Sequence, residues 1–403
     1  MIKRDYYMSK ISPFIGVNLI KVLTGIRRSG KSVMLKLIQN ELYSRGVKES
    51  EIFEINFEDI SSEIPKKAED LHELILNKKK VNKSLKYLFL DEIQEVKDWE
   101  KCVNSLLSKD EFDIYITGSN ARLLSSELAT YLTGRYVEIH VYPFSFKEFV
   151  SLNVDTYGDN TLDDQFNRYI LIGGFPFLSH FATDTEAVSL YLNDIYNSVL
   201  VKDVIKRNKI RNVDLLERVL HYVIAHVGES FSANSISKYF KSEGRKVAPE
   251  TVMNLLKACE EAFLFHRVNR YDLVGKHILQ VNEKFFLSDH GLRQALYGSN
   301  MRDIQRVLEN IVYMELLRRG FKVAVGRVNQ LEVDFVCEKA GQKKYIQVSY
   351  LLASEETIGR EFGSLELIQD NYPKYVLSMD KINMSRSGIV HENIIDFLMK
   401  DDF

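Results

Sequence analysis

The chain has 403 residues, of which 45% are hydrophobic and 27% are charged, and its formal net charge is −2. A chain of this length is expected to form two to four domains, because single cores rarely grow beyond about 250–300 residues. The near-neutral charge excludes a basic field over the whole molecule, so contact with nucleic acid would need a local positive patch. Cys102, Cys259 and Cys337 lack the spacing of a zinc site or a disulfide framework, and we expect three buried thiols.

The hydropathy pattern argues against a membrane protein. No stretch approaches the roughly 18–20 consecutive apolar residues that a membrane helix requires. The most apolar N-terminal stretch, "ISPFIGVNLIKVLTGI", is interrupted by Asn18 and Lys21 and leads directly into a glycine motif, which argues against a signal peptide. The sequence therefore predicts a cytoplasmic protein without a membrane partner.

The first motif is a glycine-bounded loop between a predicted strand, residues 19–23, and a segment with helical spacing of apolar residues. It matches G-x-x-x-x-G-K-[ST], in which backbone N–H groups cradle phosphates, the lysine neutralises the β and γ phosphates and the hydroxyl coordinates Mg²⁺. The motif therefore predicts ATP and Mg²⁺ as cofactors. The predicted nucleotide-binding residues are Gly25, Ile26, Arg27, Arg28, Ser29, Gly30, Lys31, Ser32 and Val33.

Acidic residues follow a second buried strand, "YLFL" at residues 87–90. Asp91 is predicted to hold the magnesium ion through water, together with Ser32. Glu92 is predicted to orient and deprotonate the attacking water. The alternative is an acidic strand end that faces solvent.

Two further polar residues are candidates for the phosphate chemistry. Asn120 follows a third strand, "FDIYIT", and is predicted to contact the γ-phosphate or the attacking water, with Ser119 as the alternative. Arg135 precedes the next strand, and its guanidinium is a candidate to stabilise the transition state, from its own subunit or a neighbouring one. A structural salt bridge at the surface is the alternative for Arg135.

These motifs occur in a characteristic order: "GIRRSGKS", "FLDEIQ", "TGSN", "LTGRY" followed by "YPFSFKEF", and "LIGGFPF". The set resembles the prokaryotic AAA-type ATPases that carry a C-terminal domain of unknown function, and the resemblance covers nearly the whole chain. It implies an α/β P-loop domain of the additional-strand type, which we place at residues 1–150. In that family pattern Lys31, Ser32, Asp91 and Glu92 match the Walker positions, Asn120 a sensor and Arg135 the arginine after the sensor strand.

The middle of the chain is predicted to be helical. Residues 151–212 form a lid or connector, in which "IGGFPF" is a turn and "YLNDIYNSVLVKDVIKRNKIRN" is a long helix with a basic end. Residues 213–300 contain three helices followed by a strand pair, which is the order of a winged helix and also fits the resemblance. Ser232 is predicted to cap the second helix, and Pro249 is predicted to occupy the first turn of the third.

The third of these helices would enter the major groove if the segment binds DNA. Glu250 and Glu261 share its outer side and would repel phosphates, so a protein-interaction module remains the alternative. The candidate DNA-binding residues are Lys246, Thr251, Asn254, Lys257, Arg267 and Arg270.

Residues 301–403 contain an amphipathic helix, a strand and the hairpin "LEVDFVCEKAGQKKYIQVSY", an order similar to the restriction-endonuclease-like fold. Glu309 and Asp334 fall where that fold places its metal-binding acids. Gln347 stands where a carboxylate is expected and Ser349 where a lysine is expected, so one charged metal ligand and the cation beside the attacking water are missing.

Neighbouring lysines are not placed to supply the missing cation. Lys344 points to the opposite face of its strand, and Lys343 is four residues, roughly 13 Å, from Gln347. The sequence predicts a degenerate nuclease-like α/β domain, and a structural domain whose Glu332 and Asp334 face water is the alternative.

Together these features predict a Mg²⁺-dependent ATPase that positions its winged-helix and nuclease-like modules on a partner, with DNA as one candidate. The rival hypothesis is a nucleotide-gated signalling or adaptor protein that binds a protein partner or a second copy of itself. A metal-dependent nuclease is the least favoured reading.

Overall fold

A computed structural model of the chain describes residues 2–59, 64–121, 134–157, 161–181, 184–275, 277–298, 303–401 and 403. It divides into two compact units, Met1–Tyr142 with Glu261–Phe263, and Pro143–Glu260 with Leu264–Phe403. The first unit's main segment ends at Tyr142, eight residues before the predicted boundary at residue 150. The connector, the three-helix segment and the C-terminal region, predicted as three domains, belong to one unit.

The first unit is built on a parallel five-stranded sheet in the order β2-β3-β4-β1-β5. Its strands are β1 (Ile20–Thr24), β2 (Ile52–Asn56), β3 (Tyr87–Asp91), β4 (Asp113–Gly118) and β5 (Tyr136–His140). β4 is inserted between the strand that precedes the glycine loop and the strand that ends in the two acids. This inserted strand is the additional strand that the resemblance implies, and all five carboxyl ends share one edge.

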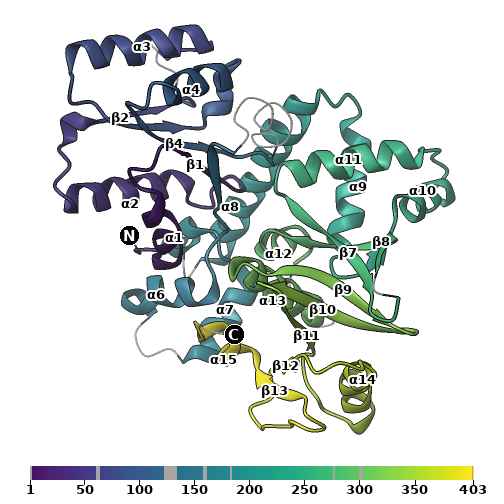
Figure 1. Ribbon diagram of the computed structural model, residues 1–403. Helices are drawn as coiled ribbons and strands as arrows, with labels where there is room; N and C mark the ends of the chain where they lie inside the picture. The colour runs from purple at the N-terminus through teal and green to yellow at the C-terminus, as the bar shows by residue number, and fades with distance from the viewer. Residues whose placement is uncertain are drawn as a thin grey trace. The chain divides into compact units, whose positions relative to one another are not determined.

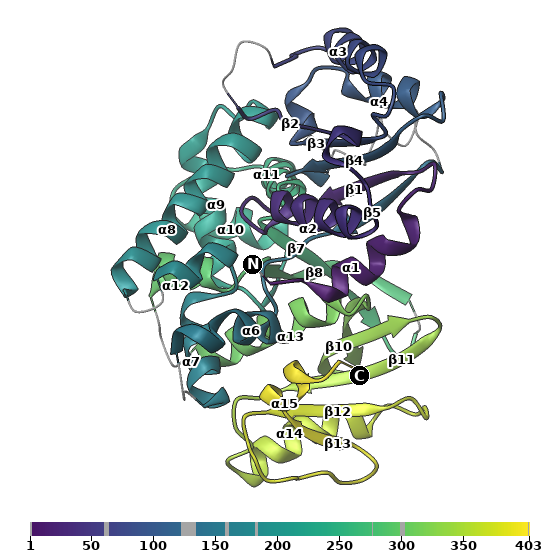
Figure 2. The same cartoon turned by 90° about the vertical axis from the view of Figure 1, so that its left-hand side faces the viewer.

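Helices cover both faces of this sheet (Figures 1 and 2): α1 (Asp5–Ile11) and α2 (Lys31–Ser44) lie on one, and α3 (Ala68–Val81) and α4 (Trp99–Leu107) on the other. Alternate strand residues belong to separate cores, with Leu88 and Ile116 on the α3–α4 face and Phe89 and Tyr115 on the α2 face. A parallel strand buried on both faces appears in the sequence as an uninterrupted apolar run, as in β3 and β4.

The second unit begins with α6 (Phe146–Tyr157), α7 (Leu162–Ile172), a 3₁₀ segment (Pro176–Phe181) and α8 (Thr185–Ser198). α8 continues as a π-helix (Val199–Lys206), so the predicted long helix is present but changes its hydrogen-bond pattern. Next come α9 (Val213–Ala225), α10 (Ala233–Ser242) and α11 (Pro249–Glu261). As predicted, the Ser232 Oγ caps α10 by accepting a hydrogen bond from Ser235 N at 3.2 Å.

A mixed eight-stranded sheet runs through the second unit in the order β13-β12-β11-β10-β9-β7-β8-β6. The strands that follow the three helices, β7 (Phe265–Asp272) and β8 (His277–Leu287), continue directly into the C-terminal strands, because β7 pairs in parallel with β9 (Lys322–Val328). This pairing joins the predicted three-helix and C-terminal regions in one sheet. The other strands are β6 (Ser230–Phe231), β10 (Leu331–Lys339), β11 (Gln342–Val348), β12 (Lys374–Ser378) and β13 (Val390–Asn393).

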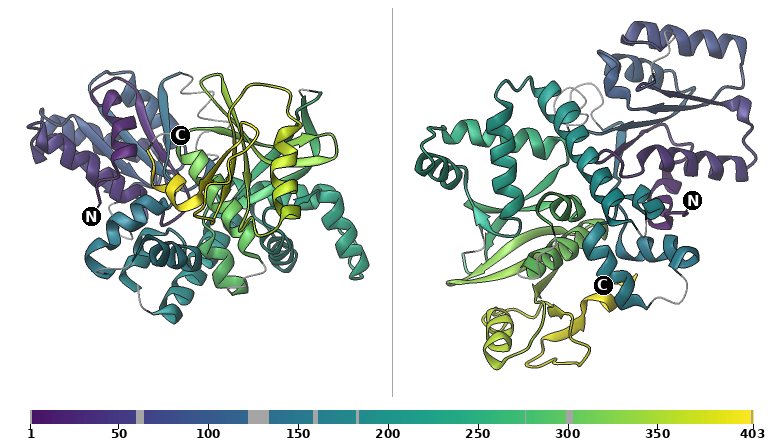
Figure 3. Two further views of the ribbon diagram at one scale, coloured as in Figure 1. Left: turned by 90° about the horizontal axis from the view of Figure 1, so that it is seen from below. Right: turned by 180° about the vertical axis from the view of Figure 1, so that it is seen from behind.

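Three helices pack against the C-terminal half of this sheet, which Figure 3 shows from two directions. α13 (Ile304–Arg318) is buried along most of its length and contacts β8, β9, β10 and β11. α14 (Glu355–Glu366) inserts Phe362 and Leu365 into an apolar core with Val333 and Val376, and α15 (Ile394–Met399) follows β13. Along the described ranges, no helix is both long and apolar enough to cross a lipid bilayer.

Close backbone contacts join the end of α7 to the turn that precedes α12 (Gly291–Tyr297). Gly174 N donates to Asp289 Oδ2 at 2.7 Å, and Phe144 N donates to Gly174 O at 2.7 Å. A Cβ atom at Gly174 would lie 2.3 Å from Phe144 O, so only glycine fits. The "GGFP" sequence is thus a turn, as predicted, whose second glycine permits this approach.

Candidate functional site

The glycine loop lies at the carboxyl edge of the five-stranded sheet, between β1 and α2. Its turns require positive φ angles, 145° at Gly25, 66° at Arg28 and 100° at Gly30. A Cβ atom at Gly25 would lie 2.2 Å from Val141 O, so the loop packs tightly against the chain after β5. These backbone angles are those that turn successive N–H groups toward a bound anion.

The loop also presents the polar side chains that a phosphate group needs. Lys31 Nζ donates to Gly25 O at 3.1 Å and Ile26 O at 3.3 Å, and lies 3.3 Å from Glu92 Oε1. Ser29 Oγ is buried, and no hydrogen-bond partner for it occurs among the described residues. A buried hydroxyl without a partner is costly, and a phosphate oxygen would satisfy it. The loop therefore fits a nucleoside triphosphate.

Asp91 and Ser32 come together beside the loop as a pair of hard oxygen ligands. Thr117 Oγ1 donates to Asp91 Oδ1 at 2.5 Å, and Asn56 Nδ2 donates to Asp91 Oδ2 at 3.3 Å. Burial raises the pKa of Asp91, and hydrogen bonds from Thr117 and Ser32 oppose that rise. Ser32 is exposed, so Mg²⁺ could reach this pair from solvent.

Glu92 is held in a constrained position next to Asp91. Its φ of 56° is left-handed, which is uncommon for a residue with a side chain, and its N–H donates to Thr117 Oγ1 at 2.8 Å. Burial opposes ionisation of the side chain, but Lys31 and a 2.5 Å hydrogen bond from Gln94 Nε2 lower its pKa to about 2. Glu92 is therefore an ionised carboxylate at neutral pH.

Glu92 should make the stability of the first unit depend on acidity. Because its folded pKa of about 2 lies below the ordinary 4.5, ionised Glu92 stabilises the fold above about pH 4.5, and this contribution is lost as pH falls toward 2. We expect on the order of 3 kcal/mol to disappear across that window, and Glu92→Gln to abolish this dependence. The single tryptophan, Trp99, is buried in α4, so its emission in urea titrations reports this unit. Identical pH dependence in both proteins would contradict the assignment.

The other residues predicted for this site include two that are buried and two that are exposed. Asn120 is buried just beyond β4, whose Gly118 lies opposite Thr24 of β1, so it belongs to the same edge as the loop. Arg27 is buried and paired with Glu58 at 2.5 Å. Arg28 and Val33 are exposed.

Arg135 is not brought to this site within its own chain. It precedes β5, its carbonyl accepts a hydrogen bond from Ile20 N at the start of β1, and its exposed guanidinium lies 3.4 Å from Asn104 Oδ1. A five-residue strand spans roughly 16 Å, so Arg135 lies at the opposite edge of the sheet from the loop. A catalytic role within the subunit is inconsistent with this position, and a role in a neighbouring subunit stays a prediction.

Arg4 lies beside the glycine loop, although no motif in the sequence marks it. It is 5% exposed; its NH1 donates to Ser29 O at 3.0 Å and its NH2 donates to Tyr142 O at 2.8 Å. The Tyr7 hydroxyl accepts from Tyr142 N at 3.1 Å. The N-terminal segment thus ties the glycine loop to the last residue before the second unit.

The candidate DNA-binding residues of the three-helix segment differ in their surroundings. Five of them are exposed, namely Lys246, Thr251, Asn254, Lys257 and Arg267. Arg267 is partly neutralised, because it lies 3.3 Å from Glu260 and 3.5 Å from Glu283. Arg270 is half-buried on β7. Of the exposed residues, Lys246 and Lys257 are the lysines available to contact phosphates.

The acids predicted for the nuclease-like site meet around Lys284, which no motif in the sequence marks. Lys284 Nζ, from β8, lies 2.6 Å from Glu332 Oε1, 3.5 Å from Glu309 Oε2 and 3.8 Å from Asp334 Oδ1. Lys284 is a charged residue at an inward-facing position of the "EKFFL" strand, and this is its one local signal. The acids that it contacts are distant in the sequence. Within the described ranges, no group of three His, Cys, Asp or Glu side chains is placed to hold a metal ion.

The Gln347 side chain forms a hydrogen bond with the backbone and is not oriented as a metal ligand. Its Oε1 accepts from Asp334 N at 3.1 Å, while Asp334 Oδ2 accepts from Val348 N at 2.9 Å. These two side chains continue the β10–β11 pairing where its backbone register ends at Phe335. As expected, Lys343 and Lys344 do not join the cluster, since they lie over the rings of Tyr271 and Phe403.

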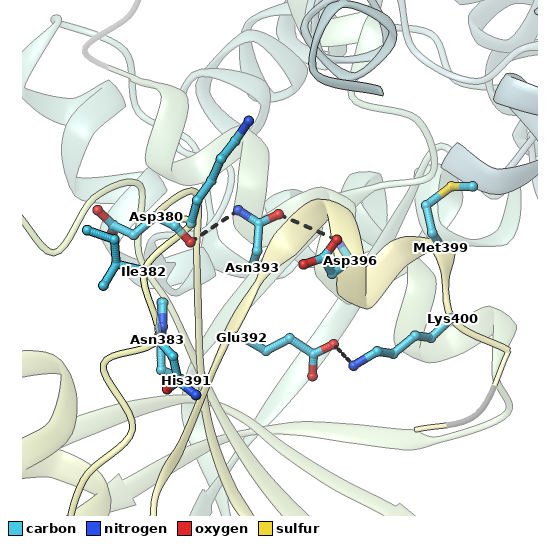
Figure 4. Close-up of a pocket in the computed structure, with 10 residues that line it drawn as sticks. Asp380, Ile382, Asn383, His391, Glu392, Asn393, Asp396, Met399 and Lys400 are labelled. Carbon is cyan, nitrogen blue, oxygen red and sulfur yellow. Dashed lines mark hydrogen bonds and ion pairs between the residues drawn. The ribbon is translucent and has the colours of Figure 1, made fainter. Parts of the chain in front are cut away.

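A separate pocket beside β13 and α15 contains none of the predicted site residues (Figure 4). Its charged and polar side chains largely satisfy one another. Lys400 Nζ lies 2.5 Å from Glu392 Oε1, and Asn393 Nδ2 donates to Asp380 O at 3.2 Å. These contacts tie β13 and α15 to the end of β12.

Comparisons with known proteins agree with the geometry of the first unit. Residues 17–150 match the family model described as an AAA domain, and residues 163–305 match one described as a domain of unknown function. The sheet order, the glycine loop and the paired acids therefore define an AAA-type P-loop protein.

The relatives extend over the whole chain. An uncharacterized protein of Haemophilus influenzae is 37% identical over 402 residues, which cover 99% of each chain. An uncharacterized protein of Methanocaldococcus jannaschii is 31% identical over 379 residues, covering 91% of this chain and 81% of its own. The chain belongs to the same family as these two proteins. It is also similar to the solved structure of a Walker-type ATPase of Pyrococcus abyssi, at 16% identity and a TM-score of 0.46, covering 73% of this chain and 95% of that one.

Proposed function

We propose that the protein is a Mg²⁺-dependent ATPase whose nucleotide state repositions a winged helix and a nuclease-like scaffold on a partner, with DNA as the partner tested first. The observation that carries the ATPase proposal is the convergence of Lys31, Asp91, Glu92 and the unpartnered Ser29 hydroxyl at one sheet edge. Each has the chemistry that phosphoryl transfer to water requires.

The roles divide among these side chains as follows. The loop N–H groups, Ser29 and Lys31 would bind the phosphates, and Ser32 with Asp91 would hold Mg²⁺, which neutralises charge on the β and γ phosphates. Glu92 would orient the attacking water and accept its proton. Lys31 pairs with Glu92 in the structure, and a phosphate that attracts Lys31 would release this carboxylate. Asn120 would contact the γ-phosphate or the water.

Strand pairing supports a winged helix in the second unit. β6 lies between α9 and α10 in sequence and pairs antiparallel with β8, so helix, strand, two helices and hairpin form one closed motif. Lys246, Thr251, Asn254 and Lys257 expose polar groups on α11 and the turn before it. In a winged helix this third helix is the one that enters the major groove.

The contacts of Arg4 support coupling between nucleotide and partner. Arg4 holds both the carbonyl of Ser29, in the glycine loop, and the carbonyl of Tyr142. The residues that follow directly, Pro143 and Phe144, belong to the second unit, where Phe144 contacts Gly174. A shift of the loop on nucleotide binding would therefore act on the segment that leads into the second unit.

The test is binding of a fluorescent DNA duplex and a branched DNA with ATP, with ADP and without nucleotide, over a range of salt. We expect affinity to differ between nucleotide states, and the double variant Lys246→Ala/Lys257→Ala to make the salt dependence shallower by about two units of log–log slope. The control Lys80→Ala/Lys322→Ala removes equal charge from exposed lysines outside this segment and should bind normally. Equal affinity in all three nucleotide states would refute coupling, since a ligand shifts only equilibria that it binds differentially.

A nucleotide-gated adaptor that binds protein is the second candidate. Arg267 favours it, because its ion pairs with Glu260 and Glu283 reduce the positive potential beside α11. It predicts ATP turnover that is indifferent to every nucleic acid.

A further inference from the structure

The charged cluster on the second unit's sheet is centred on one amine. Lys284 is 4% exposed, and its Nζ faces Glu332 and Asp334 from β10 and Glu309 from α13. Three carboxylates from two separate elements thus converge on a single buried ammonium. Such a convergence of carboxylate oxygens on a point charge is how proteins hold Mg²⁺ or Mn²⁺.

The carboxylates outnumber the cation. Glu309 Oε2 is buried and has no hydrogen-bond partner among the described residues, although it faces the Lys284 ammonium at 3.5 Å. Burial raises the pKa of Glu309 and that of Asp334, and proximity to Glu309 raises the latter further. Burial would lower the pKa of Lys284, but the three acids raise it above its ordinary value. Three carboxyl groups therefore surround one ammonium group.

We propose that Lys284 is the resident cation of this site, where its ammonium takes the place of a divalent metal ion and excludes it. The scaffold then keeps the acids of a nuclease-like domain but has no metal to activate water. Around Lys284 these acids are not placed to hold a metal ion, and replacing Lys284 with a small residue should let Glu309, Glu332 and Asp334 close on a divalent ion. The proposal does not depend on ATP hydrolysis in the first unit.

The experiment measures Mn²⁺ binding to nucleotide-free protein by electron paramagnetic resonance, with Asp91→Asn in every protein to remove the metal ligand of the first unit. Lys284→Ala should bind one Mn²⁺ at least tenfold more tightly than the parent, and adding Asp334→Asn should reverse this gain. The matched control Lys322→Ala removes an exposed lysine from β9 and should gain nothing.

If the variants are correctly folded, two results would overturn the proposal. One is Mn²⁺ binding by the parent that Asp334→Asn abolishes, since Lys284 would then stand beside a metal and not replace it. The other is no gain of Mn²⁺ binding by Lys284→Ala when its circular dichroism matches the parent. If Lys284→Ala is unfolded in chelator, recovery of the parent spectrum in Mn²⁺ supports the proposal. Failure of Mn²⁺, Mg²⁺ and Ca²⁺ to restore it rejects the proposal.

Discussion

Glu92→Gln is expected to lower ATP turnover by about 10²- to 10⁴-fold while leaving ATP affinity within about threefold, because proton transfer is lost and the phosphate contacts remain. Glutamine preserves the size of the side chain and can keep a hydrogen bond with Gln94. Turnover is measured by phosphate release at saturating ATP and Mg²⁺, and affinity by titration with a fluorescent ATP analogue.

Glu95→Gln is the matched control, because it makes the same change three residues along at an exposed position. Its turnover should stay within about twofold of the wild type. If Glu92→Gln turns over ATP at the wild-type rate, Glu92 is not the catalytic base, even though its position suits that role.

Gly174→Ala is expected to destabilise the second unit by about 3 kcal/mol or more, because the added Cβ would lie 2.3 Å from Phe144 O. Phe144 cannot withdraw freely. Its carbonyl also accepts hydrogen bonds from the Tyr169 hydroxyl at 2.9 Å and from Arg318 NH2 at 3.2 Å. The measurement is thermal unfolding by circular dichroism, with Trp99 emission recording the first unit separately.

Gly359→Ala controls for the loss of a glycine. Gly359 lies within α14 and is exposed, and nothing lies within 4 Å of a Cβ atom built there. Alanine favours a helix interior by roughly 1 kcal/mol over glycine, so this variant should be unchanged or slightly more stable. Equal melting temperatures of Gly174→Ala and the wild type would contradict this prediction. They would show that Phe144 moves away from the added Cβ atom at little cost in free energy.

Elements with strong local signals could be predicted from the sequence. The glycine loop, Asp91 and Glu92 follow apolar runs that can only be buried strands, and their parallel pairing brings all three to one edge. Ser232 and Pro249 likewise marked the starts of α10 and α11, because caps act over a few residues. Arg135 shows the limit of this reasoning, since the amino end of β5 faces away from the loop.

The AAA-type P-loop unit can be predicted from the sequence, because motif residues within a few positions of one another set the local geometry of its glycine loop. Tertiary structure alone decided that Arg4 holds the loop, that β7 joins β9 in one sheet, and that Lys284 fills the acidic cluster. Lys284 and Glu332 are 48 positions apart, and their meeting depends on strand order and register. Side-chain periodicity along one strand gives its faces, but only pairing between distant strands determines which charges share a site.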